Sequence, residues 1–245
     1  MKTQYTPRAF TLIELLAVIT IIGILAAIII PVAAHVRKTA QLARCTANMR
    51  SIATAVLLFT QDNRGNLPIA NQTYSKGEGH WYKQVAPYIQ SRTGTGSSGI
   101  GNSIGCPRAP KFKAANTDDN IGASYGWNAI GYSGNLIPPT QTQSVPVTAI
   151  PNPTRFIMIG ERLGINNGTS YARDTNWGLA PPFSSAPIDG DAIPAGPLVP
   201  GAVRLSHNKK SNYAFFDAHV RLLAPQETYT GDGNSNTLPN MWKGL

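Results

Sequence analysis

The sequence predicts an α+β fold, in which one long N-terminal helix packs through its second half on a small antiparallel sheet. Three observations support this prediction. Residues 15–34 contain no ionisable side chain, and residues 42–59 continue with apolar residues at helical spacing. The remainder offers short apolar runs separated by Gly, Ser, Asn and Pro, which is typical of short strands joined by turns.

The first apolar segment, residues 10–34, is long enough to cross a membrane as a helix. About 20 residues, each rising about 1.5 Å, span the hydrocarbon core of a bilayer. The segment's one carboxylate, Glu14, lies near its upstream end, where an unpaired charge costs about 2 to 3 kcal/mol on insertion scales. We therefore expect Glu14 to have a partner.

Two simpler interpretations of this segment are a secretory signal peptide cleaved after Val32-Ala33-Ala34 and a plain membrane anchor. The apolar run is longer than the core of a signal peptide, which has about 7 to 15 apolar residues. A plain anchor explains the hydrophobicity but gives Glu14 no role. We therefore favour an interpretation in which the carboxylate has a function.

Residues 35–61 are predicted to continue the same helix as its amphipathic half. Pro31 removes one backbone hydrogen bond and is expected to bend or loosen the helix there. The polar turn residues around Gly65 and Pro68 predict the end of the helix, so residues 62–245 form the predicted globular domain. One apolar stripe should pack on that domain, and it consists of Leu42, Cys45, Met49, Ile52, Val56 and Phe59.

Short elements are predicted within the globular domain. Residues 156–159 form an apolar run that should be a central strand, because both of its faces are apolar. The stretch Leu163–Val203 is rich in Pro, Gly, Asn and Ser, and we interpret it as a long irregular excursion over the surface. The other predicted elements are a short helix at 81–89, a strand at 124–128 and a hairpin of 213–216 with 219–223.

The two cysteines, Cys45 and Cys106, form either a disulfide or two buried free thiols, and the sequence leaves both possibilities open. In an oxidising compartment, a bridge would stabilise the domain by about 3 to 4 kcal/mol. Free Cys is itself a commonly buried residue. Two cysteines without Cys-x-x-Cys spacing do not indicate a zinc site.

The run Ala9-Phe10-Thr11-Leu12-Ile13-Glu14, after a short leader containing Lys2 and Arg8, resembles the type IV pilin and type II secretion pseudopilin signature. The resemblance implies that prepilin peptidase removes residues 1–9, cutting between Ala9 and Phe10, and methylates the Phe10 amine. Glu14 matches the glutamate of the family, and Pro31 matches its helix-kinking proline. A neighbouring subunit's Glu14 is expected to neutralise the Phe10 amine. The family usually has Gly where this chain has Ala9, so slower processing is expected.

The resemblance implies a structural or accessory subunit of a type II secretion pseudopilus or a type IV pilus-like fibre. Its location would be the bacterial inner membrane, single-pass, with the C-terminal domain outside the cytoplasm, and after assembly a periplasmic pseudopilus or a cell-surface fibre. The implied partners are prepilin peptidase, other pilin or pseudopilin subunits in a homo- or hetero-polymer, and the inner-membrane assembly platform. The alternative is a membrane-tethered or fibre-tip binding module whose Leu163–Val203 excursion captures a polysaccharide, DNA or a secreted protein.

A second element near the C-terminus, from His207 to Asp217, is similar to the His-x9-Asp-Gly pattern of a large group of pilin-like proteins from environmental bacteria. The departure is Ala218, which stands where that group has Gly. A type I′ hairpin turn needs positive φ at both central residues, and Ala in that conformation costs about 1 kcal/mol. We therefore expect either a strained turn or a connection of another type.

Metal and catalytic chemistry are not indicated by the sequence. His207, Asp217 and His219 could be ligands of a divalent ion, but ordinary turn chemistry explains them better and no further ligand is identifiable, so we expect no metal. No catalytic motif is present, so we do not expect an enzyme. The formal net charge of +9 comes from scattered residues, and nucleic acid is not expected as a partner. Calcium is an alternative without a recognised loop, and its candidate ligands are Asp118, Asp119, Asp189, Asp191 and Asp232.

Overall fold

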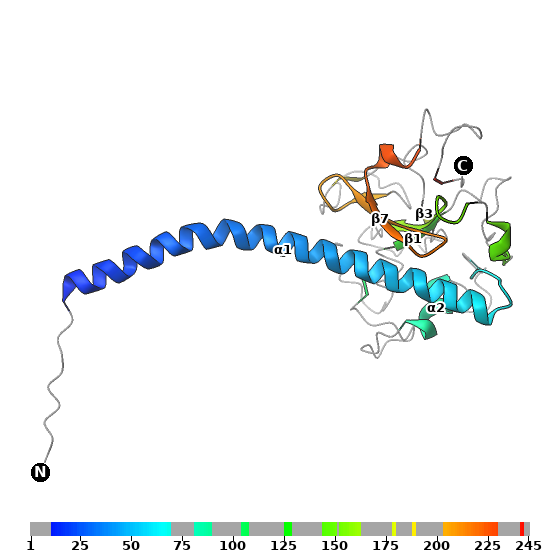
Figure 1. Cartoon of the computed structure of the whole chain (residues 1–245), viewed down its shortest axis with the longest axis horizontal. Helices are drawn as coiled ribbons and strands as arrows, with labels where there is room; N and C mark the ends of the chain where they lie inside the picture. Colours follow the sequence, from blue (N-terminus) through cyan, green and yellow to red (C-terminus); the bar gives the residue numbers. More distant parts are fainter. Residues whose placement is uncertain are drawn as a thin grey trace, which may run out of the picture. The chain divides into compact units, whose positions relative to one another are not determined.

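Helix α1 spans Leu12–Asp62 and continues through Pro31 without interruption (Figure 1). This confirms the predicted long helix. The turn after the helix contains two residues with positive φ, Arg64 (57°) and Gly65 (80°). The Gly65 N–H donates to the Thr60 carbonyl at 2.8 Å, which satisfies one of the carbonyls that the helix end leaves without a partner.

The computed structural model describes residues 11–69, 81–89, 104–107, 125–128, 144–150, 152–162, 178–179, 188–189, 203–229 and 241–242. The chain forms two units, Met1–Leu42 and Ala43–Leu245. The second unit holds the last part of α1 and every other described element. Most of the predicted excursion between Leu163 and Val203 lies outside the described residues.

Within the described residues, the main sheet of the second unit has five strands in the order β3-β1-β2-β6-β7. β1 (Tyr125–Asn128), β2 (Ile157–Glu161), β6 (Ser211–Phe215) and β7 (Val220–Leu223) are paired antiparallel, and β3 (Gly178–Leu179) joins the edge parallel to β1. The predicted antiparallel sheet is thus confirmed for four strands, with β2 central as expected. The parallel edge strand was not predicted, because it belongs to the excursion that lacks a strand pattern.

The smaller elements complete the second unit. β4 (Ile188–Asp189) pairs in parallel with β5 (Arg204–Leu205) as a separate two-stranded sheet. The predicted helix at 81–89 is present as α2 (Trp81–Val85) followed by the 3-10 helix η1 (Ala86–Tyr88). Two further 3-10 helices are η3 (Val147–Ala149) and η4 (Pro225–Glu227).

Three strands of the sheet, β1, β2 and β6, are buried on both faces. Successive side chains of a strand point to opposite faces, and the β6 segment divides in this way. Ala214 and Phe216 join the cluster that contains Trp127 and the buried stripe of α1. Tyr213 and Phe215 join a second cluster on the other face. The stripe residues fully buried in the first cluster are Cys45, Met49, Ile52 and Val56.

The hairpin between β6 and β7 has a three-residue loop, not the two-residue type I′ turn considered above. The Phe215 N–H donates to the His219 carbonyl at 3.0 Å, and the Ala218 N–H donates to the Phe215 carbonyl at 2.9 Å. Only one loop residue, Ala218, has positive φ (66°). This is the pattern of a turn followed by a left-handed residue, the position that favours glycine. Both expectations therefore hold, because the connection is of another type and Ala218 is strained.

A tight turn of the type I′ kind occurs instead between His207 and Lys210. These two residues exchange backbone hydrogen bonds of 3.1 Å in both directions. The central residues Asn208 and Lys209 have φ of 53° and 60°, so both lie in the left-handed region. This turn holds His207 at the start of the segment that leads into β6.

We predict that Ala218→Gly stabilises the domain by about 0.5–1 kcal/mol, because glycine adopts the required positive φ without the strain of a Cβ. Ala224→Gly is the matched control. The φ of Ala224 is −74°, so glycine there only adds entropy to the unfolded chain and should destabilise by a similar amount. Chemical denaturation of the purified chain in detergent measures both changes, and a loss of stability in Ala218→Gly would contradict the prediction.

Candidate functional site

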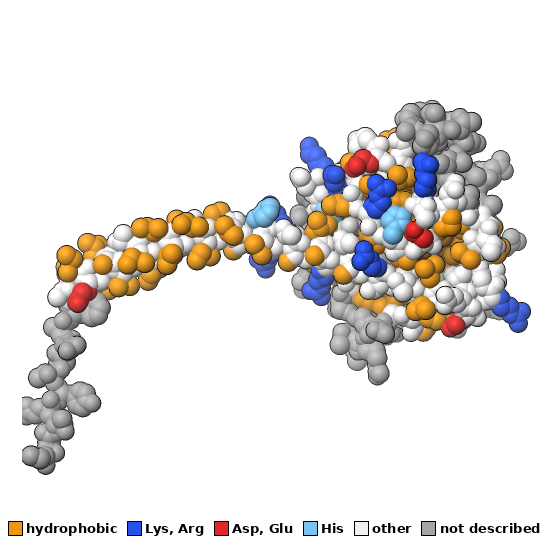
Figure 2. Space-filling model, viewed as in Figure 1, with side chains coloured by type: hydrophobic (Ala, Val, Ile, Leu, Met, Phe, Trp, Pro, Cys, Tyr) orange, Lys and Arg blue, Asp and Glu red, His pale blue; other side chains and the backbone are white. Residues whose placement is uncertain are grey.

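The stem, defined as residues 12–36 of α1, exposes large apolar side chains along its whole length (Figure 2). Their exposed fractions lie between 47% (Val18) and 83% (Leu12). By length and composition, this helix can cross a membrane, although a signal sequence passes the same test. A helix that is apolar on all sides is stable only when it is covered, which fits single-pass membrane anchoring.

Glu14 has a partner within its own helix, at the beginning of the stem. Its carboxylate accepts hydrogen bonds from the Thr11 N–H at 2.9 Å and from the Thr11 hydroxyl at 2.8 Å. In return, the Glu14 N–H donates to the Thr11 Oγ1 at 3.3 Å. This reciprocal arrangement is a capping box, which satisfies two backbone donors of the first helical turn.

The second unit contains a buried polar cluster, defined as Thr46, Glu161, His207 and Asn212. The His207 Nε2 lies 3.1 Å from one oxygen of Glu161. Asn212 donates to both Glu161 oxygens at 3.2 Å, from its side-chain amide and from its backbone N–H. The Thr46 hydroxyl donates to the Asn212 Oδ1 at 3.1 Å. Helix α1, strand β2 and strand β6 are thereby joined through one fully buried carboxylate.

The charge of this carboxylate affects a neighbouring tyrosine. Tyr125, in β1, is fully buried, and its pKa is raised, first by burial and then by the negative charge of Glu161. The buried guanidinium of Arg204 acts in the opposite direction on the same hydroxyl. Tyr213, in β6, has a pKa raised in the same way by burial and by Glu161.

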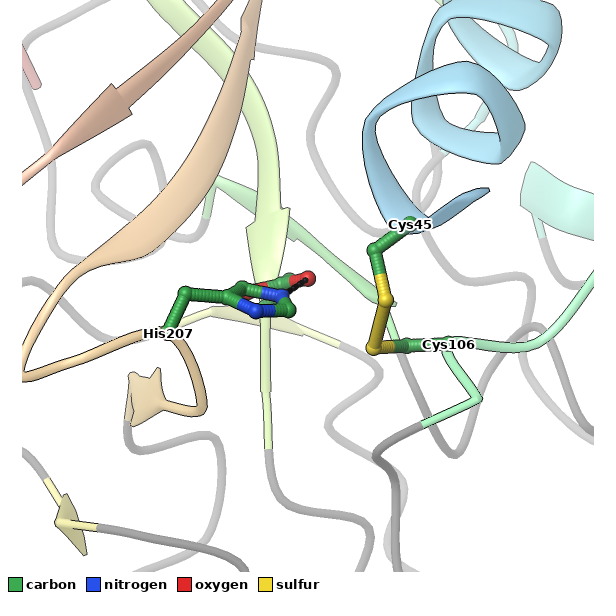
Figure 3. Close-up of side chains that lie close together, drawn as sticks. Cys45, Cys106 and His207 are labelled. Atoms are coloured by element: carbon green, nitrogen blue, oxygen red, sulfur yellow. Dashed lines mark hydrogen bonds and ion pairs between the residues drawn. A yellow bond between two sulfur atoms is a disulfide. The ribbon is translucent and has the colours of Figure 1, made fainter. Parts of the chain in front are cut away.

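Beside the polar cluster, Cys45 and Cys106 form a disulfide, with their Cα atoms 4.9 Å apart. Figure 3 shows the imidazole of His207 reaching toward the two sulfurs. The bridge joins α1 to the 104–107 segment over a sequence separation of 61 residues. A loop of this length should stabilise the folded state by about 4 kcal/mol, because the bridge lowers the entropy of the unfolded chain. The Asn48 side chain adds a hydrogen bond of 3.1 Å to the Gly105 carbonyl.

The other residues of the C-terminal element interact with each other at the β6–β7 loop. The His219 Nδ1 lies 2.5 Å from the Asp217 carboxylate, which also accepts the His219 N–H at 3.2 Å. The His219 ring stacks on Phe215, with 4.2 Å between ring centroids. His207 is instead paired with Glu161. Of the three candidate metal ligands named from the sequence, His207 therefore pairs with Glu161, whereas Asp217 and His219 pair with each other.

A family model of the prokaryotic N-terminal methylation motif matches residues 7–30. The chain carries the type IV pilin and pseudopilin signature. The match covers the leader end, Glu14 and most of the stem, and it does not extend to the His207–Asp217 element. Neither a curated protein nor a solved structure matches the chain.

The remaining predicted residues of this pilin-like chain are placed only in part. The proposed processing residues Ala9 and Phe10 lie outside the described residues. Pro31 is an interior residue of α1. Of the calcium candidates, Asp189 is in β4, but its side chain is not described. Four others lie outside the described residues, and they are Asp118, Asp119, Asp191 and Asp232.

Two features of these sites were missed by the sequence analysis. The capping box has a local signal, because Thr11 and Glu14 stand three residues apart before an apolar run. The polar cluster has a fainter one, a single acidic residue, Glu161, two positions after the predicted apolar strand at 156–159. Asn212 lies 51 residues after Glu161 in the chain. Thr46 lies 166 residues before Asn212. No local pattern links residues so far apart in the chain.

We predict that Glu161→Gln destabilises the domain by about 1–3 kcal/mol, because an amide turns one acceptor into a donor that faces the donors of His207 and Asn212. Glu227→Gln is the control. Glu227 is an exposed carboxylate that lies 3.6 Å from Lys210, and its replacement should change stability by less than about 0.5–1 kcal/mol. Denaturant unfolding of both variants measures the difference, and equal effects would show that Glu161 has no special structural role.

We predict an alkaline loss of stability above about pH 10, the ordinary pKa of tyrosine. Tyr125 and Tyr213 have raised pKa values in the folded state. The unfolded chain therefore loses their protons first. Each of the two tyrosines should lower the free energy of unfolding by about 1.4 kcal/mol for every pH unit above this pKa. Tyr125→Phe and Tyr213→Phe should each reduce the slope by about 1.4 kcal/mol per pH unit. Unfolding free energies measured from pH 8 to 11 test it, and unchanged slopes in both variants would refute it.

Proposed function

We propose that this chain is a structural or accessory subunit of a type IV pilus-like fibre or a type II secretion pseudopilus. The observation that supports this most is the stem, a helix that is apolar on all sides and begins with one carboxylate. In the proposal, the lipid bilayer covers the stem before assembly, and the stems of neighbouring subunits cover it afterwards. Apolar packing supplies most of the cohesion of the fibre.

In this proposal, prepilin peptidase removes residues 1–9 and leaves a cationic amine at Phe10. The Glu14 carboxylate of a neighbouring subunit neutralises that amine within the apolar core. The capping box with Thr11 gives Glu14 a partner before assembly, and it orients the carboxylate at the helix start. The carboxylate then exchanges a hydrogen-bond partner in its own chain for an ionic partner in the next subunit.

Substitutions at Glu14 and Thr11 separate capping from ion pairing. Glutamine can close a capping box but carries no charge, so Glu14→Gln should keep the helix start and lose the proposed ion pair. We expect its incorporation into fibres to fall by more than about tenfold, because an uncompensated charge in an apolar environment costs several kcal/mol. Thr11→Ala, the matched control, removes the cap and keeps the carboxylate, and it should assemble to nearly the normal extent.

The measurement is the fraction of processed chain in sheared or purified fibres from a bacterial host with an active prepilin peptidase. Intact-mass analysis of the same samples reports processing, with a chain that starts at N-methylated Phe10 as the expected product. If Glu14→Gln assembles normally and Thr11→Ala does not, the glutamate acts as a cap and not as a charge. A mature chain that starts at Met1 or at His35 would overturn the proposed function.

A further inference from the structure

Four side chains of the kinds that bind transition metals converge in the second unit. They are Cys45 of α1, Cys106, Glu161 at the end of β2 and His207 of the tight turn before β6. One candidate ligand atom from each lies within 4.8 Å of the other three, and all four residues are buried. Exposed acidic groups often gather without binding an ion, but this set is buried and mixes sulfur, nitrogen and oxygen.

The set has the composition and size of a tetrahedral zinc site. Zinc binds Cys sulfur at about 2.3 Å and His nitrogen or carboxylate oxygen at about 2.0–2.2 Å. Tetrahedral geometry then places two sulfurs about 3.8 Å apart, and a nitrogen and an oxygen about 3.4 Å apart. The His207 Nε2 and the Glu161 Oε1 are already 3.1 Å apart. This pair needs little movement to become two ligands of one ion.

The surrounding residues hold the Glu161 carboxylate in place. Asn212 donates to both of its oxygens, and Thr46 in turn donates to the Asn212 side chain. Such outer partners commonly orient the ligands of metal sites. When one oxygen binds an ion, the other still accepts the Asn212 N–H.

We propose that the reduced chain binds one divalent transition-metal ion of the zinc type through Cys45, Cys106, Glu161 and His207, and that the disulfide and the metal are alternative occupants of this position. The thiolate is the form of cysteine that binds metals, so the bridge must open first. A dithiol reductant supplies two electrons and two protons, the S–S bond breaks to give two thiols, and the reductant becomes a disulfide. Metal binding then releases both thiol protons, and the His207 ring carries its proton on Nδ1.

Metal binding leaves the buried charge of the unit unchanged. One carboxylate, Glu161, is buried in the same unit as two guanidiniums, Arg162 and Arg204. When the ion binds, its two positive charges are offset by the two negative charges of the thiolates. The site therefore accepts the ion without adding a net buried charge, which would be costly.

The experiment uses the full chain in detergent, reduced without oxygen, and titrated with Co²⁺ as a spectroscopic probe and with Zn²⁺ in competition against a chelator. We expect one Co²⁺ per chain, with the absorption of a tetrahedral site and a thiolate charge-transfer band. The oxidised chain should bind none. His207→Gln and Glu161→Gln should each weaken binding by at least about tenfold, whereas His219→Gln, at a partly exposed histidine outside the cluster, should leave binding unchanged.

Circular dichroism of the same samples controls for unfolding. The binding free energy of a structural zinc site is large compared with the stability of a small domain, so Zn²⁺ should restore folding if reduction loosens the domain. Three results would overturn the proposal. They are a reduced chain that stays folded and binds no ion, a reduced chain that stays unfolded with Zn²⁺, and binding that is equal in the wild type and in His207→Gln.

Discussion

The arrangement of the second unit depends on one buried carboxylate, that of Glu161. Removing an ionised group from water costs several kcal/mol unless its hydrogen bonds are replaced, and Glu161 is fully buried at the end of the central strand. Its partners come from β6 and from the turn that precedes it, and Asn212 in turn reaches Thr46 on the helix. The carboxylate is satisfied only when the central strand, β6 and the turn are all in place, and Thr46 of the helix binds the Asn212 side chain that donates to it. Burial of this one group therefore makes their arrangement specific, beyond what apolar packing alone requires.

The long helix meets two different demands along its length. In the stem, no side of the helix is polar, so its surroundings must be apolar on every side. From Cys45 onward, one stripe is buried in the first core cluster, while Arg44 and Arg50 remain exposed. The same secondary structure thus presents an apolar surface on all sides in one half and joins a globular core in the other. The change occurs through residue pattern alone, with no break in the backbone.

The parts of the fold that could be predicted are those with a local signal. The helix, its end near Gly65, the central strand and the β6–β7 hairpin each follow from periodicity or turn residues within a short window. The parallel pairing of β3 and the β4–β5 sheet have two residues per strand, too few to show a period. The candidate site behaves in the same way. Histidine 207 stands out in the sequence, but its partner Glu161 is 46 positions away and is identified only by the fold.

The position of the disulfide has a mechanical consequence. Cys45 is among the first residues of the second unit, so tension carried along α1 reaches the unit close to this bridge. A covalent link passes that load directly to Cys106, and the chain between the two cysteines, over a sequence separation of 61, is shielded from extension. Under load, the oxidised domain can lengthen only beyond Cys106. In the reduced chain, the residues between the two cysteines lose this covalent shield, so the length of chain that a pull can extend depends on the redox state of one bond.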